Sequence, residues 1–240
     1  MEINTFVRLF EIFFSQRLLY PLSAMALSSA SASPSTDTPP RCLLGKVVKS
    51  NSHCDYVVQL DTQNDVDYPP QTEDYGFGQF VAFESSRHWA VGIVYDSQLF
   101  NSSFLNSGPR LTSAPDPVFT PDLIQDTCVL LNVALVGSLQ TGDSGAYGLH
   151  GIPRVVIPAN TAVYQMDIAA VHSFHRSADG GPQFAYYSHL LRSGGTFAAQ
   201  LTQQVLGELI ATELFSGAEQ RALQVLRKEL SWKSTMGAMR

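Results

Sequence analysis

The twelve residues CVLLNVALVGSL, from Cys128 to Leu139, form the most apolar run in the body of this 240-residue chain. Leu, Val and Ala dominate the run, and Asn132 and Ser138 are its polar members. A short apolar run bounded by turn residues is typical of a strand that is buried on both faces. The run therefore predicts a strand that crosses the core, and the other expected elements are placed around it.

Short runs of β-branched and aromatic residues on both sides of this strand predict further strands. They are LLGKVV (43–48), CDYVVQL (54–60), GQFVAFES (78–85), HWAVGIVYD (88–96), IPRVVIP (152–158) and TAVYQM (161–166). Ser86-Arg87 is expected as a hairpin turn, residues 97–119 as a long excursion, and Thr120-Pro121-Asp122 as a helix start. Short strands with Pro and Gly between them predict a small closed or partly open β-barrel over residues 42–176.

After an expected linker at 177–195, the period of the apolar residues changes at Thr196. Phe197, Leu201, Val205 and Leu209 recur every four residues, which predicts a helix to about Phe215. The residues Ser216 to Glu219 resemble a capping box that opens a second helix, with apolar residues on one face at Leu223, Leu226 and Leu230. The fold class is therefore mostly β with a C-terminal antiparallel helical hairpin at 196–240. Its apolar stripe is expected against the barrel, a second copy or an outside partner.

Residues 1–41 are expected to lie outside this fold. An amphipathic pattern at 3–18 precedes a stretch rich in Ser, Ala and Pro that is predicted to be disordered. The segment reads as a transit segment, as a membrane-surface or partner-binding helix, or as sequence upstream of a start at Met25, the last being preferred. No run approaches the ~20 apolar residues of a membrane span. Three dispersed cysteines, Cys42, Cys54 and Cys128, favour a reducing compartment, the cytoplasm, or the plastid stroma if residues 1–41 are a transit segment.

The charge of the chain is unevenly distributed. Its net charge is −6, and residues 42–190 carry six basic against fourteen acidic residues. Residues 217–240 carry five basic residues against two acidic ones. Because binding to a phosphate backbone requires clustered Lys and Arg, this acidic body disfavours nucleic acid as a partner. A DNA-associated accessory role that uses the basic C-terminal segment remains an alternative.

The stretch GSLQTGDSGAYG, from Gly137 to Gly148, resembles two catalytic motifs. As a phosphate-binding loop it has Asp143 where the lysine should stand, and that carboxylate would repel a phosphate. As G-D-S-G it resembles the loop of a serine nucleophile, which would combine Ser144 with His53 and Asp96. Gly, Asp and Ser are also the residues of tight turns, so a chain reversal is the preferred interpretation and a serine hydrolase using Ser144 is an alternative.

His172 and His175 are spaced so that both rings could share one helical face. Two histidines do not make a metal site, and such a pair is more often found on a helix surface. The sequence therefore predicts no catalytic residue, no cofactor and no metal site.

The order of four short motifs gives the chain a family resemblance. GKVV (45–48), GQFVAF (78–83), AVGIVYD (90–96) and NVALVGSL (132–139), followed by IPRVVIPANTAVY, resemble the HAS-barrel over about residues 43–175. This barrel occurs in HerA-type DNA-translocating ATPases and in ATP synthase subunits, and the whole chain is similar to cyanobacterial proteins that carry the barrel alone. The resemblance implies a role in holding subunits together or docking a partner, without the phosphate-binding loop of the motor.

These observations lead to a hypothesis of a non-enzymatic protein-interaction or oligomer-assembly module, with a protein partner or a second copy bound. Trp, Met and Arg are enriched at protein interfaces. The candidate interface residues are Arg154, Trp232, Met236, Met239 and Arg240.

Overall fold

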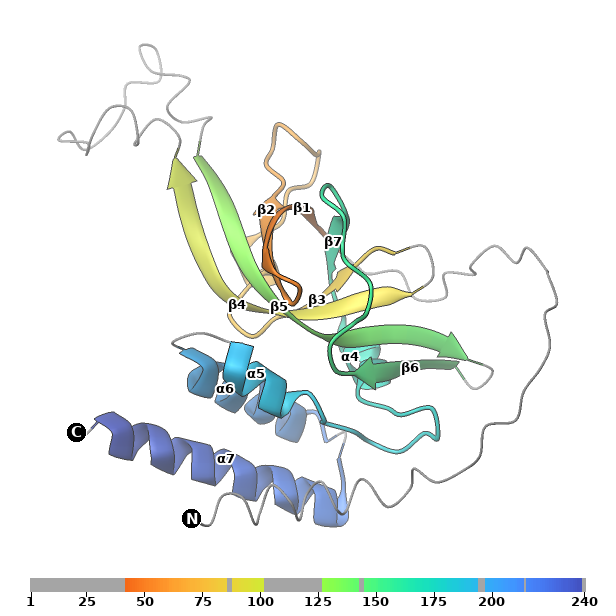
Figure 1. Ribbon diagram of the computed structural model, residues 1–240, viewed down its shortest axis with the longest axis vertical. Coiled ribbons are helices and arrows are strands. Elements are labelled where there is room, and N and C mark those ends of the chain that lie inside the picture. Colours follow the sequence, from red (N-terminus) through yellow and green to blue (C-terminus); the bar gives the residue numbers. More distant parts are fainter. Residues whose placement is uncertain are drawn as a thin grey trace. The chain divides into compact units, whose positions relative to one another are not determined.

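Six strands close into an antiparallel β-barrel in the computed structural model (Figure 1). The structure describes residues 42–85, 88–101, 127–142, 145–193, 197–213 and 215–238. The strands are β1 (Cys42–Ser52), β2 (Asp55–Leu60), β3 (Phe80–Phe83), β4 (Trp89–Asn101), β5 (Thr127–Gly142), β6 (Gly145–His150) and β7 (Ala162–Gln165), with a short 3-10 helix, η1 (Thr72–Asp74). They follow the order β2-β1-β7-β3-β4-β5-β6, and a further pairing of β2 with β5 closes the barrel. The expected barrel is thus confirmed, and it is closed.

The apolar run chosen from the sequence lies in β5, the strand that joins the two halves of the sheet. Its first part pairs with β2, it pairs with β4 along most of its length, and its last part pairs with β6. The register of β5 and β6 runs from Gly137 opposite His150 to Gly142 opposite Gly145. The stretch GSLQTGDSGAYG therefore reverses the chain as a β-hairpin, although its tip, Asp143-Ser144, lies outside the described residues.

The glycines of this hairpin mainly allow other backbone segments to approach closely. Of Gly137, Gly145 and Gly148, only one needs a positive φ. Gly145 has a positive φ of 111°, whereas Gly137 and Gly148 do not. A Cβ at Gly148 would collide with the carbonyl group of Phe174, and a Cβ at Gly137 would collide with Leu149 O. The expectation that the glycines of this stretch provide positive φ holds at Gly145, while at the other two the backbone simply needs the space.

Side chains of β3, β4 and β5 point alternately to two different cores. Val81, Phe83, Val94, Leu131 and Val133 face the barrel interior. The residues between them face outward into a second core that is shared with the helices: Phe80, Ala82, Val91, Ile93, Ala134 and Val136. Alternation with a period of two explains why these strands are apolar at almost every position.

The C-terminal helices cover the outer face of these three strands. The helices are α4 (Ile168–Phe174), α5 (Tyr187–Ser193), α6 (Ala198–Ala211) and α7 (Gly217–Ala238). Leu201, Val205 and Leu206 of α6 are fully buried against the sheet, and α7 packs on α6 through Leu223 and Leu230 (Figure 1). The apolar stripe of the predicted hairpin is therefore buried within the chain, on the barrel, and is not left for a partner.

Other sequence expectations meet the structure differently. Residues 152–158 form a loop and not the expected strand, and β6 was not anticipated as a strand. The segment 177–195, expected as a linker, contains α5 and the fully buried Tyr186 and Leu190. Phe197, placed on the apolar stripe, is 54% exposed because it precedes the first turn of α6. The expected turn at 86–87, the helix start at 120–122 and residues 1–41 lie outside the described residues.

Candidate protein-binding surface

The loop between β6 and β7, residues 151–161, crosses the rim of the barrel and is fixed at several points. His53 Nε2–H donates to Pro153 O at 2.6 Å, and Ile157 N–H donates to the buried hydroxyl of Tyr56 at 3.1 Å. Asn160 N–H donates to Val47 O at 2.8 Å. The side chain of Ile157 is buried in the barrel interior. These contacts hold the loop in one conformation, which lowers the entropy lost when a partner binds.

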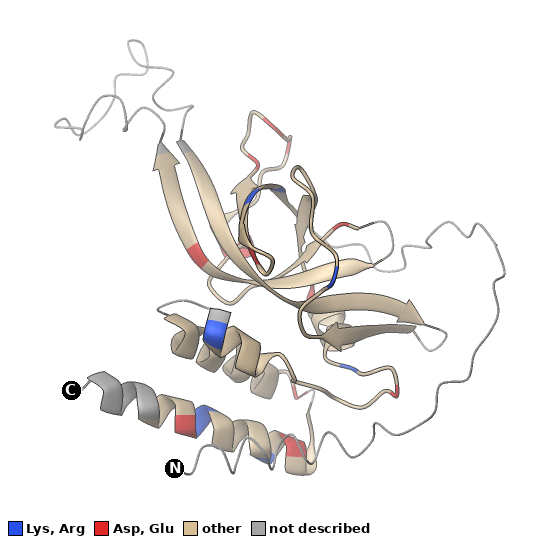
Figure 2. Cartoon of the chain, viewed as in Figure 1, with Lys and Arg blue, Asp and Glu red and all other residues tan. Residues whose placement is uncertain are grey.

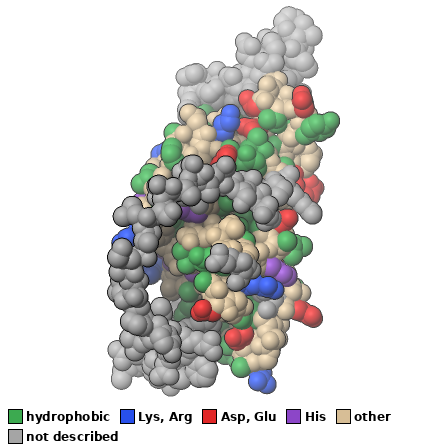
Figure 3. Space-filling view, turned by 90° about the vertical axis from the view of Figure 1, so that its right-hand side faces the viewer, with side chains coloured by type: hydrophobic (Ala, Val, Ile, Leu, Met, Phe, Trp, Pro, Cys, Tyr) green, Lys and Arg blue, Asp and Glu red, His purple; other side chains and the backbone are tan. Residues whose placement is uncertain are grey.

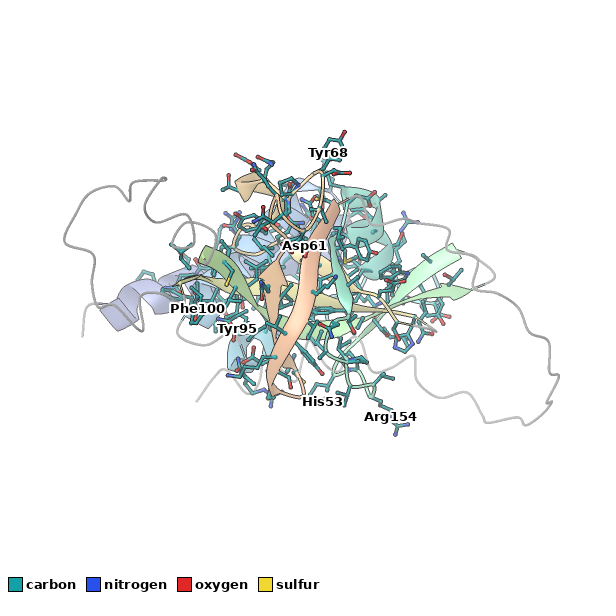
Figure 4. All side chains as sticks on the ribbon, turned by 90° about the horizontal axis from the view of Figure 1, so that it is seen from above. His53, Asp61, Tyr68, Tyr95, Phe100 and Arg154 are labelled. Carbon is teal, nitrogen blue, oxygen red and sulfur yellow. The ribbon has the colours of Figure 1, made fainter. Side chains whose placement is uncertain are left out.

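This loop exposes aliphatic side chains around one positive charge. Ile152, Val155 and Val156 are 56%, 47% and 60% exposed, and Leu149 at the end of β6 is 47% exposed. Arg154 is exposed among them and points away from the ribbon beside His53 (Figure 4). We call these five residues, Leu149, Ile152, Arg154, Val155 and Val156, the rim patch. Grouped exposed aliphatic side chains on a rigid loop are typical of binding surfaces. On the face shown in Figure 3, hydrophobic side chains lie among charged ones.

Of the predicted interface residues, Arg154 and Trp232 lie on different parts of the structure. Arg154 belongs to the rim patch, whereas Trp232 lies on α7 and is 69% exposed. The layer of α5 and α6 separates α7 from the barrel (Figure 1). The side chain of Met236 and the residues Met239 and Arg240 lie outside the described part of the chain.

The residues proposed for a serine hydrolase have other partners. His53 is engaged with Pro153 O, and Asp96 accepts hydrogen bonds from Asn132 Nδ2 at 3.1 Å and Gln98 Nε2 at 3.2 Å. No hydrogen bond joins His53 to Asp96 among the described residues. Ser144 lies outside them.

The buried His175 is hydrogen-bonded to Tyr186, and the partly buried His150 packs its ring against both of them. His175 Nδ1–H donates to Val171 O at 2.7 Å, and its Nε2 accepts from the Tyr186 hydroxyl at 2.8 Å. His150 Nε2–H donates to Phe174 O at 3.0 Å, while its Nδ1 accepts from Ala185 N–H at 3.1 Å. The acceptor role of His150 Nδ1 toward Ala185 N–H requires a neutral ring, and in the neutral His175 ring the Nδ1–H donor leaves Nε2 to accept from Tyr186. Both rings therefore help to hold these segments together.

Burial has a large effect on these groups. It lowers the pKa of His175 to about 3 and that of His150 to about 4. It also raises the pKa of Tyr186 well above its usual value. His175 is fully buried, so the interpretation of the His172–His175 pair as a helix surface is wrong for His175. No local pattern predicts its contacts, because Tyr186 and His150 come from other segments.

The thiols are less acidic than an ordinary cysteine. Burial raises the pKa of Cys42, Cys54 and Cys128, and the nearby carboxylates of Asp74 and Asp55 add to the effect at Cys42 and Cys54. No group of three or more metal-ligating side chains occurs within the described ranges. In that same part of the chain, no helix has both the length and the apolar character needed to cross a bilayer.

A family model described as "Domain of unknown function (DUF8166)" matches residues 27–240. The chain therefore belongs to this family, whose model includes the barrel and the C-terminal helices together. No curated protein matches the chain.

Proposed function

We propose that this protein is a non-catalytic assembly module, built on a barrel of the HAS type, that binds another protein chain through the rim patch. The observation that carries the proposal is the exposure of four aliphatic side chains, Leu149 at the end of β6 and three on a loop that is held by hydrogen bonds to β1, β2 and their connecting turn. Exposing them to water is unfavourable, and a partner would remove that cost.

The closed six-stranded barrel is compatible with the HAS-barrel resemblance. The apolar stripe of the helical hairpin is buried against the barrel, so it is not exposed to a partner. This supports the rim patch, and not the hairpin, as the contact surface. Arg154, which lies between Ile152 and Val155 in the loop, favours an acidic partner surface. The chain itself offers one, since residues 42–190 are strongly acidic, so the bound chain can be a second copy in a head-to-tail contact.

Light scattering after size exclusion tests self-association, because a 26.2 kDa monomer is distinguished from any oligomer. Val156→Asp together with Arg154→Glu should reduce association at least about tenfold, since both changes lie in the centre of the contact. Val225→Asp on α7, where Val225 is 42% exposed, is the matched control and should leave association unchanged.

If the protein is monomeric, wild type and the double variant are compared as baits in the same native extract, with quantitative mass spectrometry. The proposal requires a protein that binds wild type and the Val225→Asp control but not the double variant. A monomer with no such protein, in a preparation whose circular dichroism is unchanged, would contradict it.

A further inference from the structure

In the described part of the chain, the distal half of β4, beyond Val94, has one backbone edge without a partner strand. β3 pairs with Ala90–Ile93, and Val94 exchanges hydrogen bonds with Gly78 and Gln79, but no described strand pairs with this edge beyond Val94. On its other side β4 continues to pair with β5 as far as Asn101. Figure 1 shows these two strands running beyond the rest of the sheet.

Strand alternation identifies which backbone groups point to the open edge. Leu135 N–H of β5 donates to Cys54 O on the β2 side, so Asn132 of the same strand faces β4. Its register partner Asp96 then faces β5, and Ser97 and Leu99 face away from β5. Consistent with this, Ser97 N–H is capped by the Asp96 carboxylate at 2.9 Å. Leu99 N–H has no hydrogen-bond partner among the described residues, and its side chain is 75% exposed.

A groove of about 450 Å³ runs along this edge. Aromatic rings contribute much of its lining, namely Tyr75, Phe77, Tyr95 and Phe197. Phe77 is 42% exposed and Phe197 54% exposed, so the groove offers apolar surface to an incoming side chain. Figure 4 shows Tyr95 and Phe100, both from β4, on a different part of the barrel from Arg154.

The charges at the groove are acidic. Tyr95 O–H donates to Asp55 Oδ1 at 2.9 Å, and Asp96 lies in the lining next to it. No Lys or Arg lines the groove, and the red mark on β4 in Figure 2 has no blue neighbour on that strand. A second copy pairing through the same edge would bring like charges together, whereas a basic segment would be attracted.

We propose that the open edge of β4 binds an extended basic segment of another protein as an added antiparallel or parallel strand. Main-chain hydrogen bonds to the Leu99 N–H and to the carbonyl groups of Ser97 and Leu99 hold the segment. An apolar or aromatic side chain enters the groove, and Lys or Arg residues face Asp96. This site is separate from the rim patch and does not depend on the function proposed for it.

The probe is a fluorescein-labelled peptide, Lys-Val-Lys-Phe-Lys-Val-Lys, measured by fluorescence anisotropy at low salt with the full chain. Leu99→Pro removes the edge N–H without touching the β4–β5 ladder, and it should weaken binding at least about tenfold. Leu99→Ala, which loses the side chain but keeps the N–H, should stay within about threefold of wild type. Equal affinities for the two variants would overturn the proposal.

Two further measurements separate strand pairing from adsorption by charge. Asp96→Asn should weaken binding of the lysine peptide about threefold, and it should not weaken binding of a peptide with Gln in place of Lys. Two peptides are N-methylated at alternate residues, one at the odd positions and one at the even positions, and only one of these two frames should abolish binding. This test holds even if Leu99→Pro impairs folding. Loss of binding in both frames or in neither would contradict the proposal. An oligomer that Leu99→Pro dissociates would also contradict it, because the edge would then be occupied by a second copy.

Discussion

The barrel interior and the core between barrel and helices share three strands but differ in chemistry. The interior is mainly aliphatic, with Phe83 and Tyr56 at a ring distance of 6.0 Å. The second core gathers aromatic rings around His150 and His175, whose own rings are 5.6 Å apart. The interior therefore depends mainly on apolar packing and holds no histidine among the described residues, whereas the second core also depends on neutral imidazoles.

This difference separates two sources of stability. The stability that comes from apolar burial changes little with pH. A histidine that is buried in its neutral form contributes less stability as the pH falls, because the unfolded chain then binds a proton that the folded chain does not. The second core also joins the helices to the sheet, since Phe174, Tyr186 and Leu206 come from helical or loop segments. Acid is therefore expected to weaken the attachment of the helices before it affects the barrel interior.

The largest expected effect comes from truncating one ring in each core. Phe83→Ala and Phe174→Ala should each lower the free energy of unfolding by about 3–5 kcal/mol, because both rings are fully buried. Urea unfolding followed by circular dichroism measures this. Similar losses in a single transition would show that the two cores unfold together, and a loss below about 1 kcal/mol for either would break the comparison.

Gly148→Ala tests the contact between the β5–β6 hairpin and α4. The new methyl group would collide with the carbonyl of Phe174, and Gly148 N–H would lose its 2.9 Å hydrogen bond to Arg176 O. We expect a loss of about 3 kcal/mol, at the upper end for overpacking. Gly76→Ala, where the added Cβ meets no atom, is the control and should stay within about 1 kcal/mol of wild type. Thermal unfolding that is the same for both variants would contradict this prediction.

The histidines predict loss of stability in acid. Their folded pKa values lie below the ordinary value of 6.5, so protons bind the unfolded chain first as the pH falls. Their contribution is complete above about pH 6.5 and is lost progressively toward pH 3–4. From pH 7 to 5.5 the two together should cost about 2–3 kcal/mol.

Urea midpoints between pH 5 and 7.5 measure this slope, and His175→Phe provides the control. The variant should be less stable at pH 7, because Tyr186 O–H loses its acceptor, but its stability should fall less steeply with acid. An unchanged slope in the variant would refute the neutral state assigned to His175.

The smallest expected effect is at Trp232. Its side chain is 69% exposed on α7, so Trp232→Ala should change the free energy of unfolding by less than about 0.5 kcal/mol. Leu223→Ala on the same helix removes a buried contact with the second core and should cost about 2–4 kcal/mol. Equal effects in thermal melts would mean that Trp232 packs on its own chain and is not available to a partner.

Part of the candidate surface could be read from the sequence. The sequence predicts Arg154 as an interface residue, and the rim patch contains it, but three of its aliphatic neighbours, Ile152, Val155 and Val156, fall in the strand expected at 152–158. The alternation of that segment did not reveal that Pro153 and Ile157 would be held by His53 and Tyr56, which are about a hundred residues away in the chain. The open edge of β4 could not be predicted from the sequence either, because it depends on which strands pair with β4 in the folded chain.

By itself, the sequence determined the β5 run, most of the strands, the two long helices and the chain reversal at 137–148. Each of these depends on local periodicity or turn chemistry, which acts over a few residues. Only the tertiary structure decided the closure of β2 on β5, the burial of the α6 stripe on the barrel, and the His150–His175–Tyr186 network. These depend on pairings between distant segments, and no local pattern specifies which distant surface will complete a buried face or a hydrogen bond.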